Sequence, residues 1–515
     1  MVWRATDPMC NESKKICWEV SPYLRGRGVD IGAGDFKVLP HVISVDNMHH
    51  QAFGFSVKPD VVAEADKLDM FASASMDFVY SSHTLEHVAD MPTTLREWWR
   101  LVKPGGYLVM YLPHKDFYPN IGQPGANPDH KRDLLPSDVI AVMPDGWDLL
   151  ECQERNEDME YSFLLVFKKI GGKHRQCSWR NPKPDKTALV VRYGAYGDVL
   201  QASSVIKGLK EQGFHVTVHA APPGSDVLLH NPNIDNLILF DKDQVPNGNL
   251  VDFWRWQAKK YDKFVNLSES VEGTWLAMPG RRQHSWSPVV RHRYLNTNYL
   301  EHQHELADVP HKPQVMFYPT LEEKAWAAST RKRMDCKKVV MWSLSGSSVH
   351  KTHSALDSIV AGIMVEYPDT NVVLVGGADC VILEQGWEKE PRVMLTSGKW
   401  SIRQTLSFIN QCDLIVGPET GVLNAASCMD VHKVAILSHS SKENLTRDWV
   451  NTTSVYSHKT SCKQREGDVP ACHLMNYGWG VCEKDEDTGT ARCMADLHPS
   501  VIWDAVASVL SNLGR

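Results

Sequence analysis

Glycines and carboxylates at the ends of apolar runs mark the first place where this sequence could do chemistry. Asp30, Gly32 and Gly34 follow one such run, and Asp46 ends the next one, Val42-Ile-Ser-Val45. Glycine lets a backbone turn sharply and approach a ligand closely where a Cβ would clash. A carboxylate at the end of the following strand is placed to accept hydrogen bonds from ribose hydroxyls. The spacing therefore predicts a nucleotide-type ligand at the carboxyl ends of two strands.

The glycine loop is the first of three segments with a recognisable order and spacing. The segments are Val29-Asp-Ile-Gly-Ala-Gly34, His83-Thr-Leu-Glu-His87 and Leu95-Arg-Glu-Trp-Trp-Arg-Leu-Val-Lys-Pro-Gly-Gly-Tyr-Leu-Val109. In order and spacing they resemble the small-molecule group of class I S-adenosylmethionine-dependent methyltransferases, over residues 1–170. The resemblance implies a Rossmann-like sheet of seven strands that binds S-adenosylmethionine at its carboxyl edge. The implied site residues are Asp30, Gly32 and Gly34 for the methionine part, Asp46 for the ribose, and Asp66 for the adenine amine.

The methyl acceptor is expected near Asn127-Pro-Asp-His-Lys-Arg-Asp133, which looks like the loop that covers the acceptor in relatives. Imidazole titrates near neutral pH, so His130, or else His114, is a candidate general base for an acceptor hydroxyl. His83 and His87 are interpreted as bracing the loop rather than doing chemistry. A domain that binds the cofactor without catalysis also fits this part of the sequence.

A second glycine turn follows the apolar run Ala188-Leu-Val-Val-Arg192. It holds Gly194 and Gly197, and Asp198 stands where a helix is expected to begin. An acidic residue at that place caps a helix, and it could equally be a base that faces a cleft. The residue types alone leave both interpretations open.

Two later segments have the residue types that hold a diphosphate. Trp342-Ser-Leu-Ser-Gly-Ser-Ser-Val-His-Lys351 places small hydroxyl residues after an apolar run, with a lysine to offset charge. Asp413-Leu-Ile-Val-Gly-Pro-Glu-Thr-Gly-Val-Leu-Asn-Ala-Ala-Ser427 ends a second run where a helix begins, and a helix N-terminus favours phosphate. The candidate donor-binding residues are Ser345, Ser347, Lys351, Glu419, Thr420 and Gly421.

Together with the turn at Asp198, these segments resemble glycosyltransferase family 9, the heptosyltransferases and their relatives, from residue 186 onward. The resemblance implies a GT-B fold of two Rossmann-like domains and an inverting, metal-independent transfer from a nucleotide-diphosphate sugar. Asp198 matches the family's catalytic base, and the two later segments match its donor site. The sequence departs from the family at Glu419, where aspartate is usual, and at Asn424, where histidine is usual. These departures bear on the identity of the donor sugar.

Four cysteines are clustered near the C-terminus: Cys462, Cys472, Cys482 and Cys493. Zinc ligands usually come in pairs with two to four intervening residues, and the gaps here are wider. A structural zinc, disulfides and unlinked thiols therefore all stay open.

Alternating β-rich runs and helical patterns predict an α/β protein, a Rossmann-like methyltransferase domain followed by a GT-B glycosyltransferase. The predicted limits are 1–170 for the first domain, 171–186 for a linker, and 187–330 and 331–515 for the two later domains.

Composition narrows the function classes. The net charge of −7 argues against a large nucleic-acid groove, and no apolar run reaches the roughly 18 residues that span a bilayer. The N-terminal residues lack the apolar core of a signal peptide, so a cytoplasmic protein is expected. The sequence thus favours a bifunctional enzyme that methylates and glycosylates a glycan or glycoconjugate, of unspecified oligomeric state. Modification of nucleotide bases, and a scaffold with decayed sites, are the alternatives.

Overall fold

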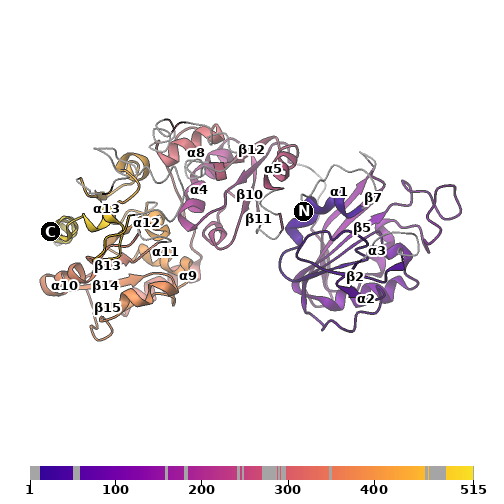
Figure 1. The fold of residues 1–515 in the computed structure, drawn as a ribbon, viewed down its shortest axis with the longest axis horizontal. Coiled ribbons are helices and arrows are strands. Elements are labelled where there is room, and N and C mark those ends of the chain that lie inside the picture. Colours follow the sequence, from indigo (N-terminus) through magenta and orange to yellow (C-terminus); the bar gives the residue numbers. More distant parts are fainter. Residues whose placement is uncertain are drawn as a thin grey trace. The chain divides into compact units, whose positions relative to one another are not determined.

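The computed structural model divides the chain into two compact units. The described residues are 12–49, 58–156, 160–178, 184–240, 244–245, 249–269, 287, 290, 297–346, 351–427, 429–458, 462 and 483–513. Unit 1 comprises residues 1–185 and 240–260, and unit 2 comprises residues 186–239 and 261–515. Figure 1 shows the elements of both units along the chain.

Unit 1 is built on one eight-stranded sheet with the strand order β3-β2-β1-β4-β5-β7-β6-β8. The first five strands run parallel, and β7 is antiparallel to both of its neighbours. The strands are β1 Gly28–Ile31, β2 Ile43–Asp46, β3 Val61–Val62, β4 Met76–Ser82, β5 Val102–Pro113, β6 Trp147–Arg155, β7 Ser162–Lys169 and β8 Arg175–Cys177. The helices are α1 Glu12–Val20, α2 Met91–Leu101, α3 Pro136–Val142 and α5 Leu250–Ala258.

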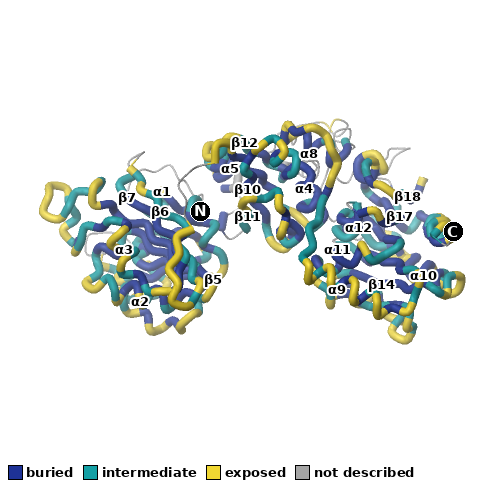
Figure 2. The backbone as a smooth tube through the Cα atoms, turned by 180° about the vertical axis from the view of Figure 1, so that it is seen from behind, coloured by how far each residue is buried: buried dark blue, intermediate teal, exposed yellow. Residues whose placement is uncertain are grey.

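The central strands of unit 1 are buried on both faces. All four residues of β1 are buried, and so are six of the seven in β4. A parallel strand covered on both faces reads as a continuous apolar run, which is why these runs are visible in the sequence. Figure 2 shows this buried sheet in dark blue. The parallel strands end together, so the residues that follow β1, β2 and β4 share one edge of the sheet.

The resemblance implied seven strands, and the structure has eight. The additional strand β8 lies in the segment 171–186 and pairs in parallel with β6. Its three residues are exposed, and side chains from elsewhere in unit 1 hold it in place. Arg175 donates a hydrogen bond to Asp145, and Ser178 donates to Asp148 from both its backbone N–H and its hydroxyl. Such a short polar strand has no periodicity that would reveal it in the sequence.

Helix α5 belongs to unit 1 although it follows β11 of unit 2 in the sequence. Trp18 of α1 lies edge-on to two of its rings, with centroids 6.1 Å from Phe253 and 5.9 Å from Trp256. Lys260 forms an ion pair of 3.0 Å with Glu19. This block lies within the predicted limits 187–330, and the structure packs it against the N-terminal helix.

Unit 2 contains two parallel sheets in succession. The first has the order β11-β10-β9-β12 and the second β15-β14-β13-β16-β17-β18. The strands are β9 Thr187–Val191, β10 His215–Ala220, β11 Asn236–Leu239, β12 Lys263–Asn266, β13 Lys338–Ser343, β14 Thr370–Val375, β15 Val393–Leu395, β16 Leu414–Pro418, β17 His432–Ile436 and β18 Thr452–Val455. The helices are α4 Tyr196–Glu211, α8 Tyr299–Ala307, α9 Leu321–Lys332, α10 Leu356–Glu366, α11 Ile402–Ile409, α12 Gly421–Ala426, α13 Arg492–Ala495 and α14 Pro499–Asn512.

The predicted fold class is confirmed. One Rossmann-like sheet precedes two further parallel sheets with crossover helices, which is the order that the sequence predicted. Among the described residues, no helix combines the length and the apolar character needed to cross a membrane.

Candidate functional sites

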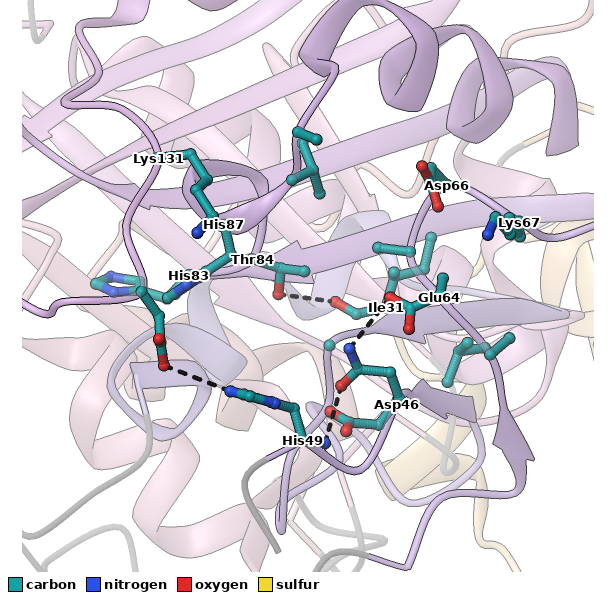
Figure 3. A pocket seen from close by; sticks show the side chains of 18 residues that line it. Ile31, Asp46, His49, Glu64, Asp66, Lys67, His83, Thr84, His87 and Lys131 are labelled. Carbon is teal, nitrogen blue, oxygen red and sulfur yellow. Dashed lines mark hydrogen bonds and ion pairs between the residues drawn. The ribbon is translucent and has the colours of Figure 1, made fainter. Parts of the chain in front are cut away.

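A cavity of about 520 Å³ opens at the carboxyl edge of the sheet in unit 1, at the ends of β1, β2 and β4 (Figure 3). This is the edge at which open α/β sheets bind their ligands. Three of the predicted cofactor residues, Gly32, Asp46 and Asp66, line it. Its lining also includes residues that the sequence did not single out, namely Asn47, His49, Glu64, Lys67, Thr84, Asp129 and Lys131.

The glycine loop after β1 is held close to the wall of this cavity. Gly32 has a φ of +75°, and a Cβ there would lie 1.9 Å from Thr84 Oγ1. Gly34 has a φ of +58°, but a Cβ there would meet nothing within 4 Å. Only the first glycine is therefore required for space as well as for backbone conformation.

Asp46 fixes the shape of the loop as well as lining the cavity. Its carboxylate accepts hydrogen bonds from the backbone N–H of Gly34 at 3.0 Å and of Met48 at 2.6 Å. Two further contacts lie at the rim of the cavity (Figure 3). Asn47 donates a hydrogen bond to Glu64, and His49 lies 3.5 Å from Asp129. The cavity therefore has an acidic side suited to donors such as ribose hydroxyls and an amine.

Asp30 stands behind the cavity. It is completely buried, and its Oδ2 accepts the backbone N–H of Val38 at 2.7 Å. Burial raises the pKa of this carboxyl to about 7. Its contact with Val38 shapes the loop that Gly32 and Gly34 begin, so Asp30 stabilises this loop without lining the cavity. Its contact with the methionine part of the cofactor stays a prediction.

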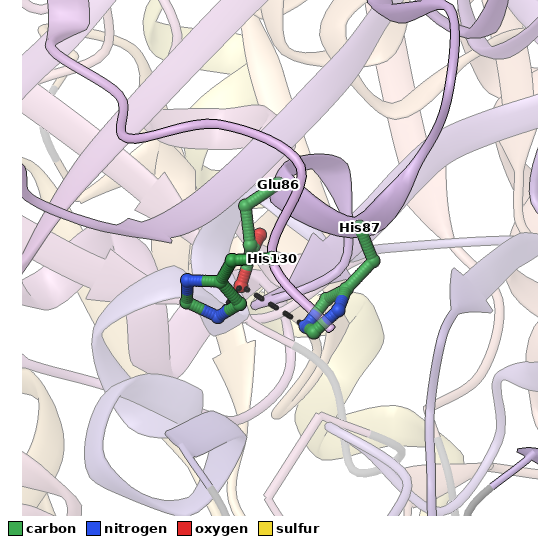
Figure 4. Close-up of side chains that lie close together, drawn as sticks. All are labelled: Glu86, His87 and His130. Carbon is green, nitrogen blue, oxygen red and sulfur yellow. Dashed lines mark ion pairs between the residues drawn. The ribbon is translucent and has the colours of Figure 1, made fainter. Parts of the chain in front are cut away.

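A cluster of one glutamate and two histidines adjoins the cavity (Figure 4). Glu86 is completely buried in the short turn after β4, and burial raises its pKa to about 8. Its Oε1 lies 3.7 Å from His87 Nε2 and 3.9 Å from His130 Nε2. The rings of His87 and His130 meet edge to face, with centroids 4.8 Å apart. His87 also lines the cavity, so the cluster forms part of its wall.

His130 lies in this cluster, not in the lining of the cofactor cavity. Burial lowers its pKa, which keeps the imidazole neutral and able to accept a proton at neutral pH. His114, the other candidate base, is stacked on Phe117 at 4.2 Å. His83 lines the cavity and its Nε2 is hydrogen-bonded to Ser162 at 2.9 Å, a bond that fixes the ring. The general-base role of His130 stays a prediction.

In unit 2, helix α4, which begins at the second glycine turn, packs against helix α12, which follows Glu419 and Thr420. A Cβ at Gly197 would lie 2.4 Å from Asn424 Nδ2, and one at Gly421 would lie 3.1 Å from Tyr196 Cβ. The N-termini of α4 and α12 therefore touch, which brings the Asp198 and Thr420 segments to the same place. Glycine on both helices makes this close approach possible.

Asp198 is engaged as a cap. It stands at the third position of α4, and its Oδ2 accepts the backbone N–H of Ala195 at 3.1 Å. Its Oδ1 lies 3.8 Å from Arg192, and the side chain is 32% exposed. The capping role is thus observed, and the second oxygen, Oδ1, faces Arg192 on a partly exposed side chain.

Glu419 and Thr420 are buried and bonded within the protein. Glu419 Oε1 accepts the backbone N–H groups of Ser438 at 2.7 Å and Ser440 at 3.1 Å, and Oε2 pairs with His439. Although burial raises the pKa of this carboxyl, its interaction with His439 lowers it to about 2. Thr420 caps α12 by accepting the N–H of Leu423. Glu419 therefore braces the loop after β17.

The phosphate segment after β13 is described in part. Ser345 Oγ is 2.6 Å from Thr352 Oγ1, and the stem of Lys351 covers Gly346, where a Cβ would lie 2.5 Å from Lys351 Cδ. Ser347 lies outside the described residues. The donor-binding roles of Ser345, Ser347, Lys351, Glu419, Thr420 and Gly421 stay predictions.

The cysteine cluster is also described in part. Cys462 is buried and Cys493 is half-buried, whereas Cys472 and Cys482 lie outside the described residues. The three alternatives for these four residues stay as the sequence left them.

Comparisons with known proteins give one family match and several similar structures. Residues 30–110 match the family model described as a methyltransferase domain. No curated protein has a sequence that matches this chain. A glycosyl transferase family 9 structure from Veillonella parvula is 15% identical, with a TM-score of 0.48, over 64% of this chain and 98% of that one. The ADP-heptose heptosyltransferase II of E. coli is 14% identical, with a TM-score of 0.45, over 64% and 100%.

A SAM-dependent methyltransferase from Aquifex aeolicus is 18% identical, with a TM-score of 0.23, over 31% of this chain and 90% of that one. The cavity at the ends of β1, β2 and β4 lies largely within the matched residues. Residues 30–110 thus both match the methyltransferase domain family and form most of this cavity.

Proposed function

We propose that the chain is a bifunctional transferase. Unit 1 transfers a methyl group from S-adenosylmethionine, and unit 2 transfers a sugar from a nucleotide diphosphate to a glycan or glycoconjugate. The observation that carries the proposal is the cavity in unit 1, because Gly32, Asp46 and Asp66 meet there inside a segment that matches the methyltransferase family.

The residues around the cavity fit the cofactor. Gly32 lines the cavity with backbone alone, and Thr84 packs closely against it. The carboxylates of Asp46, Glu64 and Asp66 can accept hydrogen bonds from ribose hydroxyls and an adenine amine. S-adenosylmethionine supplies an electrophilic methyl group on a sulfonium. With the cofactor bound, an acceptor oxygen would bond to the methyl carbon as the carbon–sulfur bond breaks and S-adenosylhomocysteine leaves. The acceptor proton would pass to a base, the role that the sequence predicts for His130. The chain holds the two reactants in line, which is the main source of rate in such a displacement.

The support for sugar transfer comes from unit 2. Two parallel sheets stand in the order that a GT-B enzyme requires, and α4 and α12 bring Asp198 beside the Thr420 segment. In this role, the partly exposed carboxylate of Asp198 takes the proton of the acceptor hydroxyl. The acceptor oxygen then bonds to the anomeric carbon as the sugar–phosphate bond breaks and the nucleotide diphosphate leaves.

Thermal unfolding of the full chain tests both halves. S-adenosylhomocysteine, ADP, GDP, UDP and CDP are added separately, each at about 100 times its dissociation constant, where binding adds about 2.7 kcal/mol of stability. We expect S-adenosylhomocysteine and one nucleotide to stabilise the protein independently. Absence of any shift with S-adenosylhomocysteine would contradict the methyltransferase half.

A second candidate is a methyltransferase joined to a sugar-nucleotide fold that has lost activity. It is favoured by Asn424 at the family's histidine position and by the internal bonds of Glu419. A stabilising effect of S-adenosylhomocysteine with no response to any of the four diphosphates would support this candidate over the first.

A further inference from the structure

Glu86 is a buried acidic residue to which the proposed function assigns no role. Its side chain is completely buried, and neither carboxylate oxygen has a hydrogen-bond partner among the described residues. A buried polar group without partners costs about 1–3 kcal/mol, and a charged one costs more. Its Oε1 lies at the cluster with His87 and His130, whose side chains lie close to the Glu86 carboxylate (Figure 4).

The donor atoms of these three residues are spaced as metal ligands are. Glu86 Oε1 is 3.7 Å from His87 Nε2 and 3.9 Å from His130 Nε2, and one donor atom from each residue lies within 4.8 Å of the other two. Bonds of about 2.0–2.2 Å to a tetrahedral cation place its ligands about 3.4 Å apart. Small side-chain movements would close the difference. His83 Nδ1 is also 3.9 Å from Oε1, but it falls outside this set of three.

The backbone holds the cluster together across 44 residues of sequence. The N–H of Lys131, next to His130, donates to the carbonyl of Glu86 at 2.9 Å. Arg132 donates to the carbonyls of Val88 at 2.7 Å and Ala89 at 2.9 Å. The loop that carries His130 is thus fastened to the turn that carries Glu86 and His87. The cluster is arranged before any cation binds, which favours a metal site.

We propose that Glu86, His87 and His130 bind a divalent transition-metal cation of the zinc class. Two imidazoles and one carboxylate with an open fourth position are a ligand set typical of catalytic zinc. Because His87 also lines the cofactor cavity, the open position would face the methyl acceptor. The cation would bind an acceptor hydroxyl and lower its pKa, so that the hydroxyl proton is released to water and the oxygen attacks the methyl carbon as an alkoxide. His130 would then act as a metal ligand, and the cation would replace it as the group that activates the acceptor. This role rests on the proposed methyltransferase function, whereas metal binding itself does not.

The test uses the full chain, freed of metal by a chelator and then titrated with Zn²⁺ and with Co²⁺. The variants are His130→Gln, His87→Gln and Glu86→Gln, and the control is His174→Gln, an exposed histidine of unit 1. Metal content is measured by elemental analysis, and circular dichroism checks that each variant is folded. The cysteines near the C-terminus are present in every variant, so any metal that they hold cancels in the comparison.

We expect about one equivalent of metal more in the wild type and in His174→Gln than in the three cluster variants. The additional Co²⁺ should give visible bands without thiolate charge transfer, because its ligands are nitrogen and oxygen. Loss of one ligand should weaken affinity by more than about 100-fold, since even partners of the ligands contribute 10–100-fold. Equal metal content in the wild type and in all folded cluster variants would overturn the proposal.

Binding of S-adenosylhomocysteine separates this proposal from the proposed function. We expect the metal-free wild type to bind S-adenosylhomocysteine, because Gly32, Asp46 and Asp66 do not belong to the cluster. If metal binds at the cluster and S-adenosylhomocysteine does not bind, the methyltransferase function fails and the metal site stands. If S-adenosylhomocysteine binds and no variant changes the metal content, the metal site fails alone.

Discussion

The predicted residues of the two units are used differently by the fold. In unit 1, Asp46 and Asp66 line an open cavity of about 520 Å³, although Asp46 also shapes the glycine loop. In unit 2, Glu419 is buried and bonded to the loop after β17, and Thr420 caps a helix. The same kind of sequence pattern therefore lies at an open cavity in unit 1, whereas in unit 2 its residues Glu419 and Thr420 are bonded within the protein.

The comparison separates two structural parts of such a motif. The glycines and caps set the backbone, and the free polar atoms recognise the ligand. Unit 2 keeps the first part, since α4 and α12 still meet through Gly197 and Gly421. Asp198 differs from Glu419, because its side chain is 32% exposed and only one of its oxygens is used in a cap.

The largest expected effect is at Gly32. The variant Gly32→Val should lose binding of S-adenosylhomocysteine completely, because its Cβ would lie 1.9 Å from Thr84 Oγ1 at a φ of +75°. The matched variant Gly34→Ala meets no atom within 4 Å and should retain binding with a stability loss of about 1 kcal/mol. Isothermal titration measures both. Equal binding by the two variants would break the claim that this loop is fitted to a ligand.

The variant Asp30→Asn tests how the buried carboxyl of Asp30 makes the free energy of unfolding depend on pH. Burial raises the pKa of Asp30 from 3.8 to about 7, so its protonated form stabilises the folded state below about pH 3.8. That contribution is lost as the pH rises toward 7. One pKa unit corresponds to about 1.4 kcal/mol, so the variant should gain up to about 4 kcal/mol relative to the wild type between about pH 4 and pH 8. Urea unfolding across this range measures the difference, and a constant difference contradicts it.

Glu419→Gln probes the bonded carboxylate of unit 2, where the sign is opposite. The pKa of Glu419 is lowered from 4.5 to about 2, so its charged form stabilises the folded state above about pH 4.5. The variant should lose about 3 kcal/mol of unfolding free energy at neutral pH, and the loss should shrink as the pH falls below about 4.5. The exposed Glu366→Gln serves as the control. A variant as stable as the wild type would mean that Glu419 is available for a ligand.

The smallest effect on stability is expected at Asp198. Asp198→Ala removes the cap on α4 and should cost about 1 kcal/mol, while Asp198→Asn keeps an oxygen that accepts the N–H of Ala195. Both variants should lose sugar transfer, since neither can accept a proton. Product formation by Asp198→Asn at the wild-type rate would reduce this residue to a cap and would assign the base to another group.

The parts of the fold that the sequence predicted are those with long apolar runs. The strands β1, β4 and β13 are buried on both faces, so their apolar character marks them without further context. Strand β8 and the placement of α5 depend on partners distant in the chain, such as Asp148 for the first and Trp18 for the second. A local pattern carries no information about such partners.

The sites show the same limit. Gly32 and Asp46 were predicted because strand ends and glycines define a loop locally, and both line the cavity. Glu86 was visible only as part of a family motif. Its burial without partners, and its nearness to His130, depend on a loop 44 residues further along the chain. The internal bonds of Glu419 likewise come from the loop at Ser438, which no motif includes.

The position of α5 affects how these units can be inherited or engineered. The chain passes from one unit to the other after residues 185, 239 and 260, so unit 1 is not encoded by one continuous stretch. A gene fragment that stops at residue 185 would omit Phe253 and Trp256, and the indole of Trp18 would be left in water. Recombination that moves the methyltransferase to a new partner must therefore carry residues 240–260 with it. Residues 240–260 thus make the coding sequences of the two units overlap in order, so that neither unit can be exchanged as one uninterrupted segment.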